Sequence, residues 1–213
     1  MSLGPNVPRG TMPTKSQEQA LGPGFTQLSK FADILAQDGV RLGLIGPREV
    51  ERIWDRHILN CAALTQLIQD GQSIIDIGSG AGLPGIVLAI LKPNSKVILI
   101  EPMQRRTDFL TQVKADLGLT NVEIIRGRAE GQKVTAQIVT SRAVAPLDKL
   151  LAWSWPLVEK GGKVLAIKGE KAQEELENAQ KVISFLKDSP ATITTCGLAL
   201  DLSVTVVEIS KEQ

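Results

Sequence analysis

Aromatic residues are scarce in this sequence: they make up 3% of the 213 residues, and tyrosine is absent. This composition argues against a sheet that recognises RNA by stacking bases on aromatic side chains. Cysteine is also rare, with only Cys61 and Cys196, which lie far apart among apolar neighbours. We therefore expect neither a disulfide framework nor a zinc site, and we interpret both thiols as small buried side chains of a protein in a reducing cytoplasm.

An excess of either charge is missing as well, because 24 Lys and Arg residues balance 23 Asp and Glu residues. Nucleic-acid-binding proteins usually show a basic excess, so any contact with RNA has to use a local basic patch. No apolar run approaches the roughly 18 residues that span a bilayer, and the first residues lack the pattern of a signal peptide. The sequence thus predicts a cytoplasmic protein with no membrane association and no metal.

What the sequence does contain is enough apolar surface for a sizeable core, with 43% hydrophobic residues. Residues 1–15 are rich in Gly, Pro and polar side chains, and we expect them to be disordered. Residues 16–71 show the helical spacing of apolar residues, interrupted at Gly22-Pro23-Gly24 and resumed at Pro47. We expect this helical segment to pack on a main domain formed by residues 72–213.

The main domain alternates short apolar runs with helical stretches. The alternation predicts a parallel sheet covered by helices on both faces, that is, a doubly wound α/β fold. Two further strand-like runs have only a short turn between them, which makes them an antiparallel hairpin. The expected parallel strands are residues 73–78, 96–101, 122–127, 136–142 and 163–168, the helices are 84–92, 103–118, 146–159 and 171–187, and the hairpin strands are 191–195 and 202–209.

A glycine-rich turn joins the first predicted strand to the first helix of the main domain. It reads Asp76-Ile77-Gly78-Ser79-Gly80-Ala81-Gly82-Leu83-Pro84-Gly85. Glycines allow the backbone to turn tightly and to approach a ligand, and the start of a helix offers free N–H groups. Glu101 ends the second strand, where a carboxylate accepts both ribose hydroxyls of an adenosine-containing cofactor in doubly wound sheets. The turn and Glu101 together predict such a cofactor.

Two cofactors fit this glycine turn. Gly80-x-Gly82-x-x-Gly85 matches the dinucleotide fingerprint, so a dinucleotide-binding oxidoreductase is one hypothesis. Asp76 stands two residues before Gly78, and this D-x-G-x-G-x-G pattern resembles the first motif of class I methyltransferases, whose acidic residue lies near the methionine amino group of S-adenosylmethionine. The terminal hairpin is similar to the seven-stranded, Rossmann-like sheet of that class. We therefore favour S-adenosylmethionine as the cofactor.

Five short motifs narrow the resemblance to one family. They are DIGSGAGLPG (76–85), RHILN (56–60), RGRAE (126–130), SRA (141–143) and IKG (167–169). In this order and spacing they resemble the glucose-inhibited division protein B family, the 16S rRNA (guanine-N7) methyltransferases, from about Gly39 to the C-terminus. One departure concerns the contacts of a loop: residues 41–46 read Arg-Leu-Gly-Leu-Ile-Gly, where many members carry an Asn-Leu-Thr-like segment.

The resemblance implies the cofactor S-adenosylmethionine and, as partner, 16S rRNA or the small ribosomal subunit. It also implies cofactor contacts in the glycine turn and after the third and fourth strands. A salt bridge to a neighbouring loop is the alternative for Arg142, and a helix-start carboxylate is the alternative for Glu130. With the glycine turn included, the predicted cofactor-binding set is Asp76, Gly78, Gly80, Gly82, Leu83, Glu101, Ala129, Glu130 and Arg142.

Methylation of guanine N7 makes small chemical demands on an enzyme. N7 presents a lone pair and needs no deprotonation, so catalysis consists of placing the reacting atoms in line and stabilising the changing charge. We therefore expect no general base. Residues 141–146 lack the Asn-Pro-Pro-Tyr-like loop of exocyclic-amine methyltransferases, and neither cysteine stands in the Pro-Cys context of C5-pyrimidine methylation. Both sequence features fit ring-nitrogen methylation.

Several basic residues are candidates for contact with RNA. Arg48, Arg52 and Arg56 recur at i, i+4 and i+8, a spacing that places them along one face of an α-helix. Two more arginines open the helix after the second strand, where positive charge is unfavourable and so indicates an external anion. The predicted substrate-binding set is Arg48, Arg52, Arg56, His57, Arg105, Arg106 and Lys168. The alternatives are a solvated face with ion pairs for the arginine stripe, loop packing for His57 and a structural role for Lys168.

The leading hypothesis is therefore transfer of a methyl group from S-adenosylmethionine to N7 of a guanosine in 16S rRNA. The alternatives are a methyltransferase acting on a small molecule or a protein, a dinucleotide-binding oxidoreductase and a non-catalytic RNA-binding module.

Trp153 and Trp155 lie in a predicted helix with apolar neighbours, and we interpret them as core residues.

Overall fold

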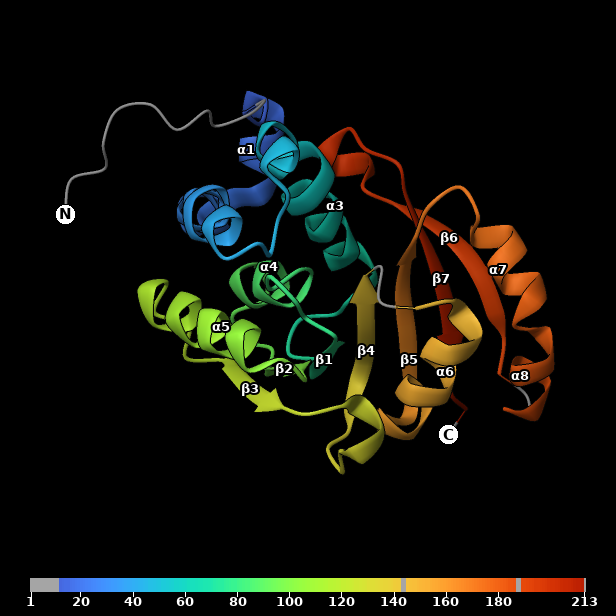
Figure 1. The fold of residues 1–213 in the computed structure, drawn as a ribbon. Coiled ribbons are helices and arrows are strands. Elements are labelled where there is room, and N and C mark those ends of the chain that lie inside the picture. Colours follow the sequence, from blue (N-terminus) through green and yellow to red (C-terminus); the bar gives the residue numbers. More distant parts are fainter. Residues whose placement is uncertain (1–11, 143–144, 187–188, 213) are drawn as a thin grey trace.

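The computed structural model describes residues 12–142, 145–186 and 189–212, and it contains a seven-stranded sheet with helices on both faces (Figure 1). In chain order the strands are β1 (Ile74–Ile77), β2 (Val97–Glu101), β3 (Val122–Arg126), β4 (Ala136–Arg142), β5 (Val158–Lys168), β6 (Ala191–Cys196) and β7 (Val204–Ser210). Their order across the sheet is β3-β2-β1-β4-β5-β7-β6.

The strand directions confirm the predicted sheet. The strands β1 to β5 are parallel to one another, and β7 is antiparallel to both β5 and β6. The sheet therefore has five parallel strands and a C-terminal antiparallel hairpin. The hairpin enters with its second strand first: β7 pairs with β5, Val164 opposite Ile209, and β6 lies at the edge of the sheet. In this strand order, β6 joins the sheet through β7.

The α-helices lie on both faces of the sheet. They are α1 (Lys15–Leu21), α2 (Phe25–Ile34), α3 (Leu59–Ala62), α4 (Gly85–Leu91), α5 (Gln104–Asp116), α6 (Leu147–Ser154), α7 (Ala172–Asn178) and α8 (Gln180–Phe185). Short 3-10 or π-helical turns adjoin several of them, namely Gly22–Gly24, Leu35–Gly39, Pro47–Arg52, Ile53–Ile58, Ala63–Leu67, Ala129–Gly131, Trp155–Leu157 and Leu198–Leu200.

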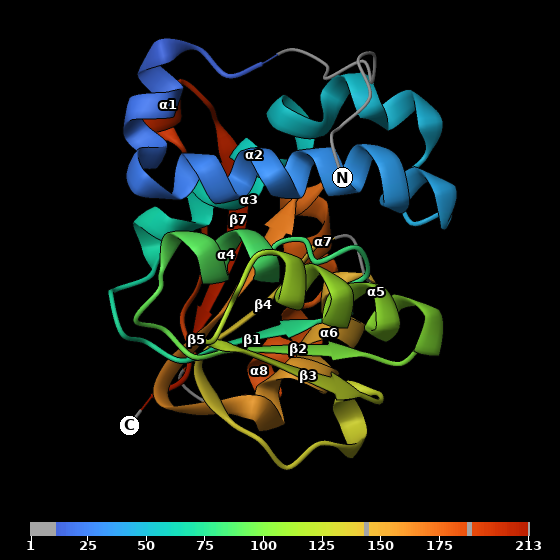
Figure 2. The same cartoon turned by 90° about the vertical axis from the view of Figure 1, so that its left-hand side faces the viewer.

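Residues of the central strands alternate between two hydrophobic cores. Ile74 of β1 belongs to a core with Phe31 and Trp54 of the N-terminal helical segment and with residues of α4 and α5. Its neighbour Ile75 belongs to a second core, formed with α6, α7 and α8. Figure 1 shows α4 and α5 on one side of the central strands and α7 and α8 on the other, and Figure 2 shows α2 lying over α4 on the first of these sides. This double burial explains why the strands appear in the sequence as continuous apolar runs.

The N-terminal helices begin at a capping box. The Thr14 hydroxyl accepts a hydrogen bond from the N–H of Gln17, and the Gln17 side chain accepts one from the N–H of Thr14. Because of this cap, α1 starts at Lys15, one residue before the expected helical segment. Residues 1–11 of the expected disordered stretch lie outside the described residues. The turn Gly22–Gly24 separates α1 from α2, which confirms the predicted interruption.

The segment that starts at Pro47 is not a regular α-helix. Residues Pro47–Arg52 form a 3-10 helix, and Ile53–Ile58 form a π-helical stretch. A 3-10 helix has about three residues per turn, which is fewer than an α-helix has, and a π-helix has more residues per turn than an α-helix. The expectation that Arg48, Arg52 and Arg56 follow one α-helical face is therefore wrong. Side-chain contacts of this segment with the sheet, described below, accompany the departure from α-helical geometry.

Two other boundaries differ from the expectation. β5 starts at Val158, earlier than expected, and α6 ends at Ser154. Val158 pairs with Ala136 before a register shift in the ladder, and Gly161 within the strand has a φ of +76°. This glycine thus accompanies an irregularity inside the strand. The helix expected over residues 171–187 is divided between α7 and α8.

Both cysteines are buried and free, as predicted. Burial raises the pKa of the Cys61 and Cys196 thiols to about 11 each, so both are protonated at neutral pH. In the part of the chain that the structure describes, no helix is both long and apolar enough to cross a membrane.

Candidate functional site

A cavity of about 670 Å³ opens at the carboxyl ends of β1, β2, β3 and β4. In doubly wound sheets this edge binds ligands where the strand order reverses, here between β1 and β4. Two walls face each other. The sheet wall consists of the lining residues within 77–83, 100–106 and 127–130, and the helical wall consists of those within 44–57. Arg142 at the end of β4 lines the cavity between them.

Part of the sheet wall is made of backbone alone. Gly78 and Gly80 line the cavity, and their φ values of +67° and +56° lie in the left-handed region that residues with side chains rarely adopt. The Gly78 N–H donates to the carbonyl of Ile100 at 2.8 Å, which ties the turn to β2. A ligand can therefore approach this wall closely.

Glu101 ends β2 and lines the cavity although it is only 1% exposed. Its two carboxylate oxygens accept the N–H groups of Gly80 and Met103, each at 3.0 Å. The guanidinium of Arg106 lies 3.6 Å from one oxygen. Each carboxylate oxygen keeps a further lone pair. The carboxylate is thus fixed in orientation and able to accept ligand hydroxyls, as a ribose requires.

Asp76 lies beneath the glycine turn and is not among the residues that line the cavity. It is fully buried, and its Oδ2 accepts the N–H of Gly85 at 2.9 Å, while Oδ1 has no partner among the described residues. Burial raises the pKa of this carboxyl to about 7, although the bond from Gly85 acts in the opposite direction. Asp76 therefore holds the turn against α4, and its direct contact with a cofactor stays a prediction.

The remaining predicted cofactor residues divide into two groups. Gly82 packs against α4, where an added Cβ would stand 2.6 Å from Cγ1 of Ile86. By contrast, Leu83, buried Ala129 and exposed Glu130 line the cavity. The structure thus gathers most of the predicted set around one cavity, while Asp76 and Gly82 do not line it. The residues at the cavity are Gly78, Gly80, Leu83, Glu101, Ala129, Glu130 and Arg142.

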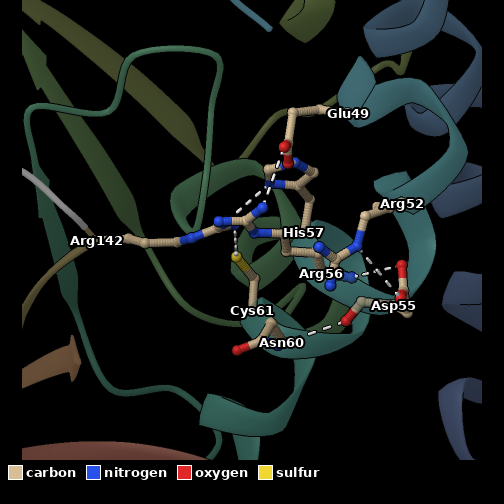
Figure 3. A network of polar contacts seen from close by, with 8 residues as sticks. All are labelled: Glu49, Arg52, Asp55, Arg56, His57, Asn60, Cys61 and Arg142. Atoms are coloured by element: carbon tan, nitrogen blue, oxygen red, sulfur yellow. Dashed lines mark hydrogen bonds and ion pairs between the residues drawn. The ribbon is translucent and has the colours of Figure 1, made fainter. Parts of the chain in front are cut away.

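A chain of side-chain contacts joins the helical wall to β4 (Figure 3). Arg142 donates from Nη2 to Nδ1 of His57 at 2.7 Å and from Nη1 to Sγ of Cys61 at 3.6 Å. Nε2 of His57 lies 2.9 Å from Oε2 of Glu49, and the other oxygen of Glu49 accepts Nη1 of Arg56 at 3.0 Å. The partners of Arg142 are thus an imidazole and a thiol of the helical segments, and no salt bridge of Arg142 to a loop, the alternative expected for it, is found among the described residues.

These contacts determine the protonation state of His57. A guanidinium only donates, so Nδ1 is the acceptor and the proton lies on Nε2, facing Glu49. Burial and the Arg142 charge lower the pKa of His57 below its ordinary value of 6.5, and Glu49 partly opposes them. The imidazole is neutral at neutral pH with both nitrogens engaged. It is therefore not a free general base.

The three arginines of the predicted stripe have different surroundings. Arg56 lines the cavity and pairs with Glu49. Arg52 is exposed, and its Nε lies 3.9 Å from the Asp55 carboxylate. Arg48 is exposed, and no ion pair is found for it within the described ranges. Ion pairing thus neutralises part of this segment, and a predicted contact with RNA remains open to Arg48 and Arg52.

The other predicted substrate residues lie in three places. Arg106 lines the cavity beside Glu101, whereas Arg105 lines a separate hollow of about 550 Å³ between the N-terminal helical segment and α5. Lys168 is 8% exposed and donates to the Ala145 carbonyl at 2.9 Å and to Glu175 at 2.7 Å. These contacts favour the structural alternative for Lys168.

Several residues that line the cavity were not predicted as functional. Leu44, Ile45 and Gly46 line it, and they belong to the loop in which the sequence departs from the family pattern, so no motif marks them. Trp153 packs against the second core, as expected of a core residue, but it also lines the cavity. The sequence shows Glu49 only as a carboxylate near the arginines. Its contact with His57 was not predicted, because the two residues are eight positions apart, which is more than one helical turn.

The strand order with antiparallel β7, the glycine turn after β1 and the buried acid at the end of β2 define a class I, Rossmann-like methyltransferase fold. A solved methyltransferase from Pyrococcus furiosus matches with a TM-score of 0.57 and 17% identity, over 70% of this chain and 80% of that chain. A putative S-adenosylmethionine-dependent methyltransferase from Methanococcus maripaludis matches with a TM-score of 0.60 and 16% identity, over 96% and 97% of the two chains.

The sequence comparison identifies the family within this class. The family model for GidB, rRNA small subunit methyltransferase G, matches residues 25–203. The ribosomal RNA small subunit methyltransferase G of Mycolicibacterium gilvum is 47% identical over 201 residues, covering 92% of this chain and 88% of that protein. Its counterpart from Thermobifida fusca is 46% identical over 202 residues, covering 93% and 85%. The chain belongs to the GidB family of S-adenosylmethionine-dependent methyltransferases, and the alternative of an oxidoreductase is set aside.

The residues of the cavity fit S-adenosylmethionine. The left-handed glycines leave a wall without side chains, and the oriented Glu101 carboxylate is suited to the ribose hydroxyls. Among the described residues, no group of three or more His, Cys, Asp or Glu side chains is arranged to hold a metal ion.

Proposed function

We propose that this chain transfers a methyl group from S-adenosylmethionine to N7 of a guanosine in 16S rRNA, in the cytoplasm. The observation that carries the proposal is the character of the cavity. Its single histidine is neutral and engaged at both nitrogens, so the lining orients ligands and offers no free imidazole base. Guanine N7 needs none, because its lone pair is already available. The names of the relatives, which are ribosomal RNA small subunit methyltransferases, support RNA as the substrate class.

The sheet wall supports the cofactor half of the reaction. S-adenosylmethionine supplies an activated methyl group on a sulfonium centre. The chain holds it through the backbone at Gly78 and Gly80 and through the carboxylate of Glu101, whose orientation is set by two backbone N–H groups. Arg142 lines the cavity at the end of β4 and bonds to His57 of the helical wall. The protein thus contributes by holding the two reactants in place, and this positioning lowers a large part of the activation barrier of a displacement reaction.

The helical wall supports the RNA half. The net charge is only +1, so attraction to phosphate depends on local groups. Arg48 and Arg52 are exposed in the same short segment as Glu49, which lines the cavity. Exposed arginines beside the opening provide phosphate contacts that position a nucleotide without reading its sequence.

The test is methyl transfer from tritium-labelled S-adenosylmethionine to small ribosomal subunits prepared without the modification, and to free 16S rRNA. The RNA is then digested and the labelled nucleoside is identified. We expect label in 7-methylguanosine. The Lys96→Ala variant, altered in an exposed ion pair with Glu123 at the opposite end of β2, should work at the rate of the wild type. Label in another nucleoside would overturn the N7 assignment, and label in protein alone would overturn the RNA substrate.

A further inference from the structure

The contacts of His57 connect parts of the molecule that are distant in sequence. Arg142 is separated from His57 by 85 positions and belongs to β4, whereas Glu49 and His57 belong to the 3-10 and π-helical segments of the helical wall. All three residues line the cavity. Figure 3 shows them in a row, with the imidazole between the carboxylate of Glu49 and the guanidinium of Arg142.

We propose that His57 is a positioning residue that holds the guanidinium of Arg142 in the cavity, and that cofactor binding thereby depends on the helical wall. The inference rests on the proposed function, because it takes S-adenosylmethionine as the ligand of the cavity. It gives His57 a role in the reaction that requires neither proton transfer nor contact with RNA.

The imidazole suits this role because its two nitrogens do different things. Nδ1 accepts from Arg142 at 2.7 Å, and Nε2–H donates to Glu49 at 2.9 Å, so Glu49 selects the tautomer that presents a lone pair to the arginine. The His57 side chain is 11% exposed and the Glu49 side chain 28%, which limits competition from water. The charged and titratable groups that face His57 are Glu49 and Arg56 from the helical wall and Arg142 from β4; the Cys61 thiol of α3 lies on the other side of Arg142.

Arg142 needs such a partner because a long side chain at the end of a strand has many rotamers. Its described contacts use Nη2 for His57 and Nη1 for the buried Cys61 thiol, a weak acceptor. The His57 bond is thus the strong one of the two. A guanidinium held in this way keeps other N–H donors for an anionic or polar group of a ligand.

Two conservative variants separate the two halves of the contact chain. The side-chain oxygen of His57→Asn lies near the position of Nδ1 and keeps an acceptor for Arg142. The amide nitrogen of His57→Gln lies near the position of Nε2 and keeps a donor for Glu49 instead. We expect His57→Asn to bind S-adenosylmethionine within about threefold of the wild type and His57→Gln to bind roughly tenfold more weakly, since only the second loses the hydrogen bond to Arg142.

A double-variant comparison tests whether His57 acts through Arg142. Arg142→Ala should weaken cofactor binding by roughly tenfold or more, and adding His57→Gln to it should cause less than about a twofold further loss. Calorimetry gives the affinities, and thermal unfolding of each variant checks that it is folded. Lys96→Ala again serves as the matched surface control.

The pH dependence of cofactor binding is a further test, because replacing a residue with a purely structural role would leave that pH dependence unchanged. Protonation turns Nδ1 from an acceptor into a donor, which opposes Arg142. Since the pKa of folded His57 is lowered below 6.5, the wild type should lose cofactor affinity only as the pH falls through that lowered value. His57→Asn should lack this step.

The outcomes are distinguishable. Equal cofactor affinity in wild type and His57→Gln, or additive losses in the double variant, would overturn the inference and leave the proposed function standing. A rise in the KM for RNA with unchanged cofactor affinity would do the same and would make His57 an RNA contact. If the wild type does not bind S-adenosylmethionine, the proposed function falls and the inference falls with it.

Discussion

The two walls of the cavity are held in shape by different means. In the sheet wall, backbone N–H groups and left-handed glycines position the ligand-facing groups, as with the 3.0 Å bonds from Gly80 and Met103 to Glu101. In the helical wall, the 3-10 and π-helical segments bring charged side chains together, and Glu49 holds both Arg56 and His57. The sheet wall is therefore held by backbone hydrogen bonds, whereas the helical wall depends on side-chain contacts that a proton can alter.

The largest effect should come from a side chain placed in the sheet wall. Gly78→Val puts a β-branched residue at a φ of +67° beside the ligand, so we expect S-adenosylmethionine affinity to fall at least about a hundredfold. Calorimetry measures the affinity, and circular dichroism checks the fold. The matched control is Gly118→Val, because Gly118 has a similar φ of +63° with nothing within 4 Å of its added Cβ. Equal binding by Gly78→Val and wild type would place the cofactor elsewhere.

The next effect concerns the carboxylate that the sheet wall orients. Glu101→Gln keeps the shape but removes the charge that strengthens hydrogen bonds to ribose hydroxyls, and its amide nitrogen cannot accept the N–H of Gly80 or Met103. Binding should therefore weaken by roughly 1–3 kcal/mol, or about 5- to 150-fold. The loss should be much smaller for a 2′-deoxy analogue of the cofactor, which lacks one of the hydroxyls. The same loss for both ligands would mean that Glu101 acts only by holding Gly80 and Met103.

A smaller effect is expected from the exposed arginines beside the helical wall. Arg48→Ala combined with Arg52→Ala should lower the salt dependence of RNA binding by roughly one to two units of slope, since each lost phosphate contact removes about one. Cofactor affinity should stay unchanged, because neither residue lines the cavity. The control is Arg41→Ala, whose guanidinium is exposed but paired with Asp38 at 2.7 Å. An unchanged slope would locate the RNA on another surface.

The smallest effect on binding is expected for the residue beneath the glycine turn. Asp76→Asn should keep cofactor affinity within about threefold and change the pH dependence of stability instead. The pKa of Asp76 is raised from 3.8 to about 7 on folding, so the wild type binds a proton more tightly when folded and loses stability as pH rises through about 7. The variant lacks this loss, and its advantage in melting temperature should therefore grow between pH 5 and pH 8. A large loss of affinity would instead show a direct cofactor contact.

The sheet wall was predictable because its determinants are local in sequence. Buried parallel strands produce continuous apolar runs in the sequence, and a glycine turn between a strand and a helix indicates the ligand-binding edge of a doubly wound sheet. The structure brings Gly78, Gly80, Leu83 and Glu101 to one cavity, and their contact with the cofactor stays a prediction. The burial of the Asp76 side chain away from the cavity was not predicted. The sequence pattern locates a residue in the turn but does not say which way its side chain points.

The helical wall was less predictable because its geometry depends on distant partners. Assuming α-helical spacing for Arg48, Arg52 and Arg56 ignored the 3-10 and π-helical turns that accompany the contact of His57 with Arg142. The order of the last two strands was open for a related reason. A hairpin can join a sheet by either of its strands, and only packing with β5 decides that β7 enters first.

The position of β7 also constrains the order in which the molecule can assemble as it is synthesised. β6 leaves the ribosome before β7, yet its hydrogen-bonding partners in the sheet belong to β7. The five parallel strands can pair before β6 has a partner. The edge of β5 stays unpaired until residues Val204–Ser210 are synthesised and insert between β5 and β6. A chain interrupted before Val204 would leave the edge of β5 and the whole of β6 unpaired, and such unpaired strands are ready sites for association with other chains.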